Sequence, residues 1–242
     1  MRKFFLLFLL CSGHALNVLP LAAQNSAAPK PSLPDQKPLD EQLMATLTWD
    51  HCDIARVRAL IRQGASPNAA NWDGNSLTAL MVATQEGCAD IVELLLNDGA
   101  NVNAKALQTS GVEGHVLSGI TALSLAPRSG DIAIVKMLVK RGADIRSRDS
   151  MGRTALAYAT TNEIAQFFLD HGLDINARDK DGYTLLIRSG EPFNRPSIAF
   201  LLEHGADPNA KAKDGTTALK LAQGHFGHPE DVELLKKAGA KE

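Results

Sequence analysis

DIVELLLNDGANVNAK, residues 90–105, is one copy of a pattern that recurs along the chain, and the triplet Thr78-Ala79-Leu80 opens the same copy. The opening Thr returns at Thr121, Thr154, Thr184 and Thr217, and a closing Gly stands at Gly64, Gly99, Gly142, Gly172, Gly205 and Gly239. Successive Thr positions are separated by 43, 33, 30 and 33 residues. A unit of about 33 residues is therefore repeated, with one insertion and one deletion.

Each unit predicts a pair of short helices. The Thr hydroxyl can accept a hydrogen bond from the first turn of one helix, and the Gly can take the left-handed conformation that ends a second helix. Apolar residues lie seven, five and four positions before the Gly, as Val92, Leu94 and Leu95 do, and they form one helix face. A single pair of short helices cannot bury that face, so the pairs are expected to stack as a solenoid.

The pattern DxxGxTxL…A…IVxLLLxxGAxxNA closely resembles the ankyrin repeat, most clearly in residues 73–105, 149–178, 179–211 and 212–242. The resemblance implies an all-α ankyrin-repeat solenoid of about six helix-turn-helix repeats with β-hairpin fingers. In two respects the chain departs from the family. The Pro and the His that follow Thr in the family are both absent, so the family's hydrogen-bond cluster between Thr and His is not expected here.

The chain is expected to consist of a leader, a linker and one repeat domain. Residues 1–23 combine Arg2 and Lys3 with an apolar run and with small residues at candidate cleavage points after Ala15 or Ala23, which predicts a secretory signal peptide. An uncleaved anchor is the alternative. Residues 24–38 hold four Pro and almost no large apolar residue, which predicts a disordered linker.

Residues 39–242 predict the repeat domain. Its repeats are expected at about 39–70, 71–105, 106–148, 149–178, 179–211 and 212–242. The third contains a long loop insertion at 106–119, which should protrude along the hairpin edge because any other position would break the helix stack. The fourth is short between its two helices, at residues 160–162. The first and last repeats are expected to act as caps.

Composition and motifs argue against catalysis and against nucleic acid as a partner. The formal net charge of −2 differs from the basic surface that nucleic-acid binding needs. GxSxG, P-loop, HExxH and CxxC motifs are absent, so no catalytic residues, metal ligands or cofactors are predicted. His225 and His228 are two imidazoles without a nearby carboxylate or Cys at metal-ligand spacing. His171 and His204 stand near expected helix ends, where a structural role is favoured.

Cys52 and Cys88 are expected in the inter-helix turns of adjacent repeats, 12 and 11 residues before the closing Gly. Neighbouring repeats are separated by about 10 Å, and a disulfide needs Cα atoms within about 7 Å. The offset of one residue could bring the two into range. A disulfide that links the first repeat to the second and a pair of inert buried thiols both remain open.

Partner-binding residues are expected on the hairpin tips and on the inner face of the first helices. Trp, Tyr, Met and Arg anchor many protein interfaces, and several occur at these positions. The candidates are Trp72, Gln85, Arg128, Met151, Arg153, Tyr183 and Lys213. A second group of charges, Lys105, Arg148, Arg178 and Lys211, follows the hairpin edge. Interleaved Asp residues indicate either a basic ridge for an acidic partner or a self-compensating solvated face.

The resulting hypothesis is a non-catalytic protein-binding module. The leader predicts a periplasmic or secreted location without stable membrane insertion after cleavage, and the repeat domain is expected to be a monomer that binds another protein. An immunity or inhibitor protein and an accessory protein of an envelope enzyme both suit that location, since the chain resembles bacterial periplasmic ankyrin-repeat proteins. The alternative is a ligand- or metal-binding stress-protection protein, with residues 225–228 or the insertion as the capture site.

Overall fold

The computed structural model describes residues 38–49, 52–71, 76–109, 116–189, 196–224 and 228–241, and residues 37–242 form one compact unit. The predicted leader at 1–23 and nearly all of the predicted linker lie outside the described residues. Within the described residues, no helix has the length and apolar character needed to cross a membrane.

The described residues form six helical pairs in chain order. The pairs are α1 (Leu39–Trp49) with α2 (Ile54–Arg62), α3 (Ala79–Gln85) with α4 (Ala89–Asn97), α5 (Ala122–Ser129) with α6 (Ile132–Lys140), η1 (Ala155–Tyr158) with α7 (Asn162–Asp170), α8 (Leu185–Ser189) with α9 (Ile198–Glu203), and α10 (Ala218–Ala222) with α11 (Pro229–Lys237).

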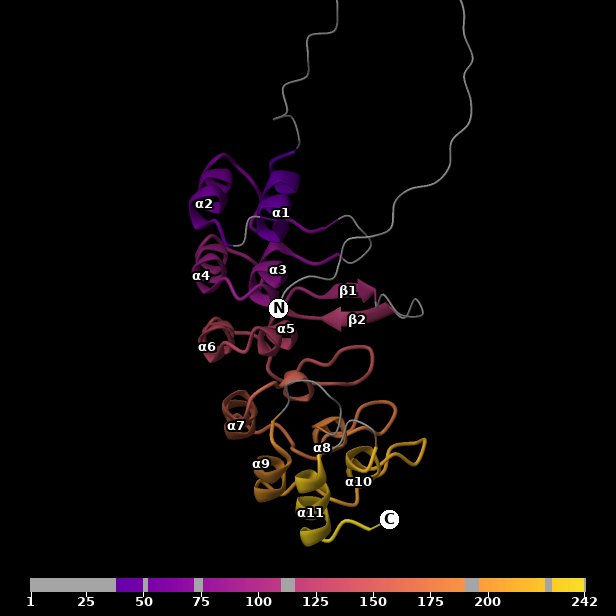
Figure 1. Ribbon diagram of the computed structural model, residues 1–242. Helices are drawn as coiled ribbons and strands as arrows, with labels where there is room; N and C mark the ends of the chain where they lie inside the picture. The colour runs from indigo at the N-terminus through magenta and orange to yellow at the C-terminus, as the bar shows by residue number, and fades with distance from the viewer. Residues whose placement is uncertain are drawn as a thin grey trace, which may run out of the picture. The chain divides into compact units, whose positions relative to one another are not determined.

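The pairs stack in two layers. The first helices contact one another in sequence, as α1 contacts α3, α3 contacts α5 and α5 contacts η1, while α2, α4, α6 and α7 form a parallel series (Figure 1). The core lies between the layers and is built from fully buried side chains of both, including Leu95, Leu123, Ile134 and Phe168. The predicted all-α solenoid is confirmed.

The helix ends follow the predicted chemistry with one exception. Thr78, Thr121, Thr184 and Thr217 accept hydrogen bonds from backbone N–H groups of the first turn at 3.1–3.3 Å. The closing Gly residues have φ values from 78° to 106°, a region in which a side chain would be strained. Thr154 makes no capping bond. The expected cap was wrong there because the helix that follows is a single 3₁₀ turn.

The shortened fourth unit explains that 3₁₀ turn. The chain leaves η1 at Ala159, where ψ is 133°, and enters α7 through Thr161, whose side chain accepts from the N–H of Ile164 at 3.2 Å. The deletion therefore removes the last turn of the first helix. The Thr160 hydroxyl donates to the carbonyl of Pro127 in α5 at 2.5 Å, so a side chain contacts the preceding repeat next to the missing turn.

The expected long loop insertion is a two-stranded antiparallel ribbon on either side of residues 110–115, which lie outside the described residues. β1 (Ala106–Thr109) pairs with β2 (Val116–Ile120), with an irregularity in register after Ala106 (Figure 1). The ribbon base is held against the next repeat. A Cβ atom on Gly119, whose φ is 77°, would lie 3.2 Å from the carbonyl oxygen of Arg148. In the described segments that lead from the closing Gly of one repeat to the Thr of the next, the only other strand pairing is a single bridge, between Ala70 and Thr78.

A second, polar series of contacts joins successive repeats on the side of the closing glycines. Four Asn residues stand four positions after a closing Gly, at Asn68, Asn103, Asn176 and Asn209. Each Asn donates its side-chain N–H to the carbonyl of the next closing Gly and accepts the N–H of a residue just beyond it; Asn103, for example, bonds Gly142 O at 2.9 Å and Asp144 N at 2.8 Å. We call this series the Asn ladder.

The Asn ladder is interrupted between the third and fourth repeats. The equivalent position there is Arg146, whose Nη2 lies 3.5 Å from where a Cβ of Gly172 would stand. The same junction contains the shortened η1. The side-chain hydrogen bonds of one Asn are therefore missing at the junction where the first helix of the repeat, η1, is also the shortest.

Replacing Arg146 by Asn should restore the missing rung. We expect Arg146→Asn to raise the free energy of unfolding by about 1 kcal/mol, since an intramolecular hydrogen bond contributes about 0.5–1.5 kcal/mol net. Chemical denaturation would measure the change. Asn103→Ala, which removes an existing rung, is the matched control and should lower stability by a similar amount. An Arg146→Asn variant no more stable than the parent would show that the short fourth repeat holds Gly172 out of reach.

Candidate functional site

Cys52 and Cys88 are joined by a disulfide with Cα atoms 5.4 Å apart. Cys52 precedes Asp53, the N-cap of α2, and Cys88 is the N-cap of α4. Cys52 is exposed with φ 71°, whereas Cys88 is buried. The bond thus connects the inter-helix turns of the first two repeats at one surface position.

The fingers, which we define as the segments that lead from the closing turn of one repeat to the Thr of the next, are bonded to each other by their backbones. Ser150 N donates to Ser118 O at 2.8 Å, Lys180 N to Met151 O at 2.7 Å, and Lys213 N to Asp181 O at 2.8 Å. Four successive fingers therefore form a continuous edge. The backbones of neighbouring fingers are held at a fixed spacing.

Asp149 organises the fourth finger. Its side chain is fully buried, and its two oxygens accept four hydrogen bonds. Oδ1 accepts the backbone N–H groups of Met151 at 2.8 Å and Arg153 at 3.0 Å. Oδ2 accepts Arg153 Nε at 2.8 Å and the hydroxyl of Tyr158 on η1. The Arg153 guanidinium lies 5.0 Å from the centre of the Tyr158 ring. Asp149, Arg153 and Tyr158 form one closed cluster.

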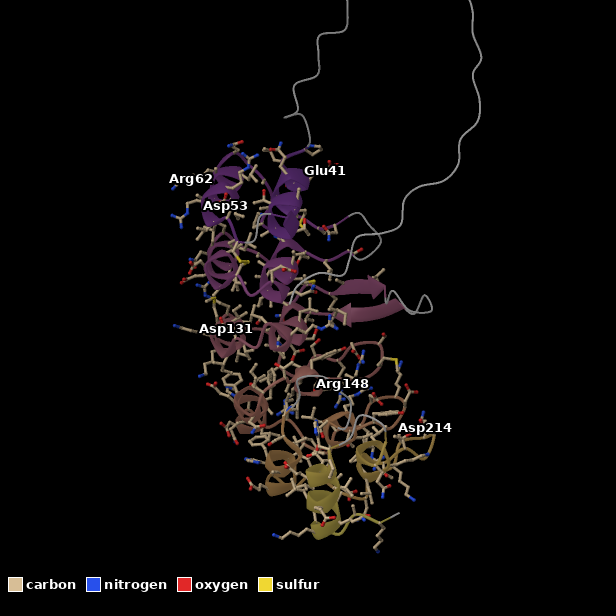
Figure 2. The ribbon with its side chains drawn as sticks, viewed as in Figure 1. Glu41, Asp53, Arg62, Asp131, Arg148 and Asp214 are labelled. Carbon is tan, nitrogen blue, oxygen red and sulfur yellow. A yellow bond between two sulfur atoms is a disulfide. The ribbon has the colours of Figure 1, made fainter. Side chains whose placement is uncertain are left out.

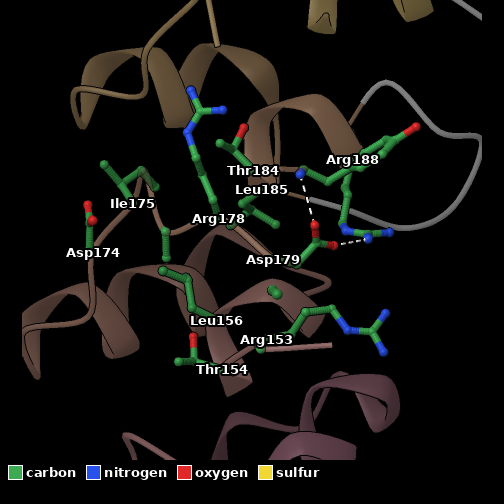
Figure 3. Close-up of a pocket in the computed structure, with 14 residues that line it drawn as sticks. Arg153, Thr154, Leu156, Asp174, Ile175, Arg178, Asp179, Thr184, Leu185 and Arg188 are labelled. Atoms are coloured by element: carbon green, nitrogen blue, oxygen red, sulfur yellow. Dashed lines mark hydrogen bonds and ion pairs between the residues drawn. The ribbon is translucent and has the colours of Figure 1, made fainter. Parts of the chain in front are cut away.

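The fifth finger holds the same three residue types around Asp179. Oδ1 of Asp179 accepts the N–H of Tyr183 at 2.9 Å, and Oδ2 binds the guanidinium of Arg188 on α8 (Figure 3). That guanidinium lies 5.1 Å from the Tyr183 ring centre. The Tyr183 hydroxyl donates to Asp214 of the sixth finger at 2.9 Å. Tyr183 therefore packs on its own repeat and links two fingers.

The two clusters exchange Arg and Tyr between equivalent positions. In each of these two repeats, the Asp stands five residues before the Thr that opens the repeat. One of the residues Arg and Tyr stands one position before that Thr, and the other stands four positions after it. The fourth repeat has Arg153 before and Tyr158 after, and the fifth has Tyr183 before and Arg188 after. The flanking repeats carry Ile120 with Leu125 and Thr216 with Leu221 at these positions. We call Asp149–Arg153–Tyr158 and Asp179–Tyr183–Arg188 the two Asp–Arg–Tyr triads.

Sequence reasoning missed four members of the triads, Asp149, Asp179, Tyr158 and Arg188, as functional candidates. The signal was available, because the same three residue types occur at the same three positions in two adjacent repeats and in neither flanking one. Reading each position alone hides it, since Arg and Tyr change places.

Arg128 extends the first triad toward solvent. It is exposed at the end of α5, and its guanidinium lies 5.9 Å from the Tyr158 ring centre, so two guanidinium groups contact one ring. Burial raises the pKa of Tyr158 above its usual range; the Arg153 charge opposes that effect, and the hydrogen bond to Asp149 adds to it. Tyr158 therefore stays a neutral hydroxyl that donates to Asp149. Among the described residues, Arg128 forms no ion pair.

The structure places the other predicted partner-binding residues along the same face, except Trp72, which lies outside the described residues. Gln85 ends α3 at the position equivalent to Arg128, and its side-chain oxygen is buried without a hydrogen-bond partner. Met151 is half-buried in the fourth finger, and Lys213 is exposed in the sixth. Arg153 and Tyr183, which were expected on the hairpin tips, also contact other residues of the chain. Arg153 binds Asp149, and Tyr183 lies against Arg188 and donates to Asp214.

In the group of charges that follows the hairpin edge, two arginines form hydrogen bonds to the backbone, while Lys105 and Lys211 are exposed. Arg148 donates to the carbonyl of Gly152 at 2.5 Å, and Arg178 donates to the carbonyls of Gly182 and Lys211 at 3.4 and 2.6 Å. These arginines cross-link backbone instead of pairing with the interleaved Asp residues. Figure 2 shows Arg148 and Asp214 on the finger side of the stack, while Asp53, Arg62 and Asp131 lie on the side of the second helices.

The hollows between described residues are small or open. A cavity of ≈ 20 Å³ lies between the fourth and fifth repeats, below Asp179 and Arg188 (Figure 3). That volume holds about one water molecule, so it does not fit a substrate. An open depression on the outer face of α11 is lined by Pro229, Glu233 and Leu234 among others.

Histidines do not assemble a metal site among the described residues. Within that part of the chain, no group of three or more His, Cys, Asp or Glu side chains could hold a metal ion. His171 and His204 lie at helix ends, where each ring contacts Phe167 or Phe200 and each Nδ1 lies 2.7 Å from the carbonyl of that Phe. His228 is exposed at the start of α11, and residues 225–227, the rest of the alternative capture site, are not described.

Comparison with known families gives one match. A family model described as ankyrin repeats (3 copies) matches residues 31–106, 104–179 and 162–242. Comparison with curated proteins found no match.

Proposed function

Because this chain belongs to the ankyrin-repeat family, whose repeats indicate a protein–protein interaction module, we propose that it is a non-catalytic protein that binds a partner protein through its finger face. We define the finger face as Arg128, Met151, Arg153, Tyr158, Tyr183 and Lys213. The observation that carries the proposal is the pair of Asp–Arg–Tyr triads. Tyr and Arg are enriched among the residues that carry interface energy. Here the buried carboxylate of Asp149 holds Arg153 and Tyr158, and Arg188 and Asp214 hold Tyr183, before any partner arrives.

Preorganisation is the physical reason for this choice of surface. Ordering a long side chain on binding costs about 0.5–1.5 kcal/mol. Arg153 has that cost removed by Asp149, and Tyr183 by Arg188 and Asp214. The backbone bonds between fingers keep the spacing of these side chains fixed as well. A partner therefore meets a surface that is already in its binding geometry.

We also propose that the protein is exported to the periplasm or secreted. The charged and apolar pattern of residues 1–23 supports the proposal. The disulfide supports it independently, because such bonds persist in oxidising compartments. Mass spectrometry of the chain recovered from a periplasmic fraction would test it, since an amino terminus at residue 16 or 24 is expected. A chain found only in the cytoplasm with residues 1–23 intact would end the proposal.

In that compartment the protein would act as an inhibitor or immunity protein, or as an accessory to an envelope enzyme. Both roles require one tightly held partner. The alternative of ligand or metal capture has less support. The cavity between the fourth and fifth repeats fits about one water, and within the described residues no group of three or more His, Cys, Asp or Glu could hold a metal ion.

The finger face is tested by affinity capture from native envelope extract. The mature chain should retain a partner that an Arg128→Ala, Lys213→Ala variant loses, with at least a tenfold drop in affinity when the partner is purified. Both side chains are exposed, so the fold should be unaffected.

The matched control is Arg58→Ala, Lys237→Ala, which removes two exposed cations from α2 and α11, away from the fingers. Partner binding should survive this change. Equal binding by all three proteins would remove the finger face from consideration.

A further inference from the structure

Asp149 has no capacity left for a second cation. Its carboxylate is fully buried and receives four donors, two on each oxygen. It compensates Arg153 through Nε only. Nη2 of Arg153 is buried and has no hydrogen-bond partner in the described structure. A buried guanidinium N–H without an acceptor is costly, so a ligand oxygen that reached this atom would remove the cost.

Arg128 brings a second cation to the Tyr158 ring. It is exposed, and its guanidinium shares the Tyr158 ring with that of Arg153. The cluster thus holds two cations and one carboxylate, and that carboxylate is already saturated. On α6 and α7, Lys136 and Glu163 pair with each other at 3.8 Å.

The chemistry that completes this cluster is a carboxylate. Resting on the proposed function, we propose that the partner presents an acidic peptide segment, and that a Glu or Asp side chain of that segment binds between Arg128 and Arg153 beside Tyr158. Charge-assisted bonds from guanidinium to carboxylate are stronger than neutral ones, and a half-buried position reduces their screening by water and salt.

A nucleic-acid strand fits the surface less well. Base stacking needs a free aromatic face, and a guanidinium group already lies over each tyrosine ring of the triads. Exposed carboxylates at Asp181 and Asp214 on the finger tips would also repel a phosphate backbone. An acidic peptide can avoid these positions, because its own charges are spaced and can alternate with Lys180 and Lys213.

The test uses a capped hexaglutamate peptide as the probe and capped hexaglutamine as its neutral control. Binding is followed by NMR through the arginine Nε–Hε resonances of the mature chain. We expect the resonances of Arg128 and Arg153 to shift and saturate together with hexaglutamate and to stay unchanged with hexaglutamine. Arg128→Gln should weaken binding at least fivefold, Arg128→Lys should weaken it less, and the exposed control Arg58→Gln should leave it unchanged.

Uniform small shifts of all exposed arginines would overturn the inference, as would tighter binding of oligothymidylate through Arg128 and Arg153. The two proposals fail separately. If captured partner depends on Arg128 and Lys213 while hexaglutamate does not bind there, the finger face remains the binding surface and the acidic chemistry is wrong. If hexaglutamate binds at Arg128 and Arg153 but the captured partner does not need them, the acidic site stands and the proposed function fails.

Discussion

Reduction of the Cys52–Cys88 disulfide is expected to lower the free energy of unfolding of the first two repeats by about 4 kcal/mol, the chain-entropy value for a loop of this length. The bonded residues are separated by 36 positions, and the loop they close spans the second helix of one repeat and the first helix of the next. Stability in a repeat array is a sum of repeat and neighbour terms. The loss should therefore fall on α1 and α2, which lie at the end of the described stack.

Chemical denaturation with and without a thiol reductant would measure the effect. Cys52→Ala is the appropriate variant, because Cys52 is exposed and its loss leaves the packing of buried Cys88 intact. Cys88→Ser is less suitable, since a hydroxyl at that N-cap could add the capping bond that Cys88 does not make. Reductant should not affect Cys52→Ala. An identical midpoint for the oxidised and reduced parent would show that the bond adds no stability.

Removal of the Asp149 carboxylate is expected to be equally damaging. Asp149→Ala leaves the half-buried Arg153 charge, two backbone N–H groups and the Tyr158 hydroxyl without their acceptor. Breaking a buried ion pair by removing one partner costs about 3–5 kcal/mol. Asp149→Asn should cost less, because its amide oxygen can still accept the two backbone N–H groups.

A double-mutant cycle that combines Asp149→Ala with Arg153→Ala measures the interaction energy between these two residues separately from their other contacts. The double variant should be more stable than the sum of the single changes implies, because the uncompensated cation is gone. Asp181→Ala, at an exposed tip of the next finger, is the control and should leave the denaturation midpoint nearly unchanged. If Asp149→Ala lowers the free energy of unfolding by less than about 1 kcal/mol, the cluster contributes no more than a surface ion pair does, and the prediction is wrong.

The fold could be predicted because its determinants repeat at a fixed interval. Thr at the start of a first helix and Gly at the end of a second act within a few residues, so their spacing alone indicates the helical pairs. Prediction failed where one repeat differs from the rest. The missing turn after Tyr158 makes η1 a 3₁₀ helix, and Thr154 loses its capping role as a result. The insertion extends as strands because its ends continue an existing finger.

The site could be predicted only in outline. The position of Arg128, Met151 and Lys213 in the repeat was enough to predict their place in the fold, but the contacts of Arg153 and Tyr183 depend on side-chain directions between a finger and a helix. The Asn ladder was missed for a related reason. Asn103 bonds Gly142 and Asp144 in the next repeat, and no local pattern shows that reach.

The junction between the third and fourth repeats is held unequally on its two sides. Ser150 and Ser118 bond the fingers there, and Thr160 reaches Pro127, but Arg146 leaves the opposite side without its rung. Amide hydrogen exchange should therefore divide the array into two cooperative blocks, one ending near Arg146 and one beginning near Thr154. Arg128 belongs to the first block and Arg153 to the second, so a ligand that contacts both would slow exchange in both blocks at once.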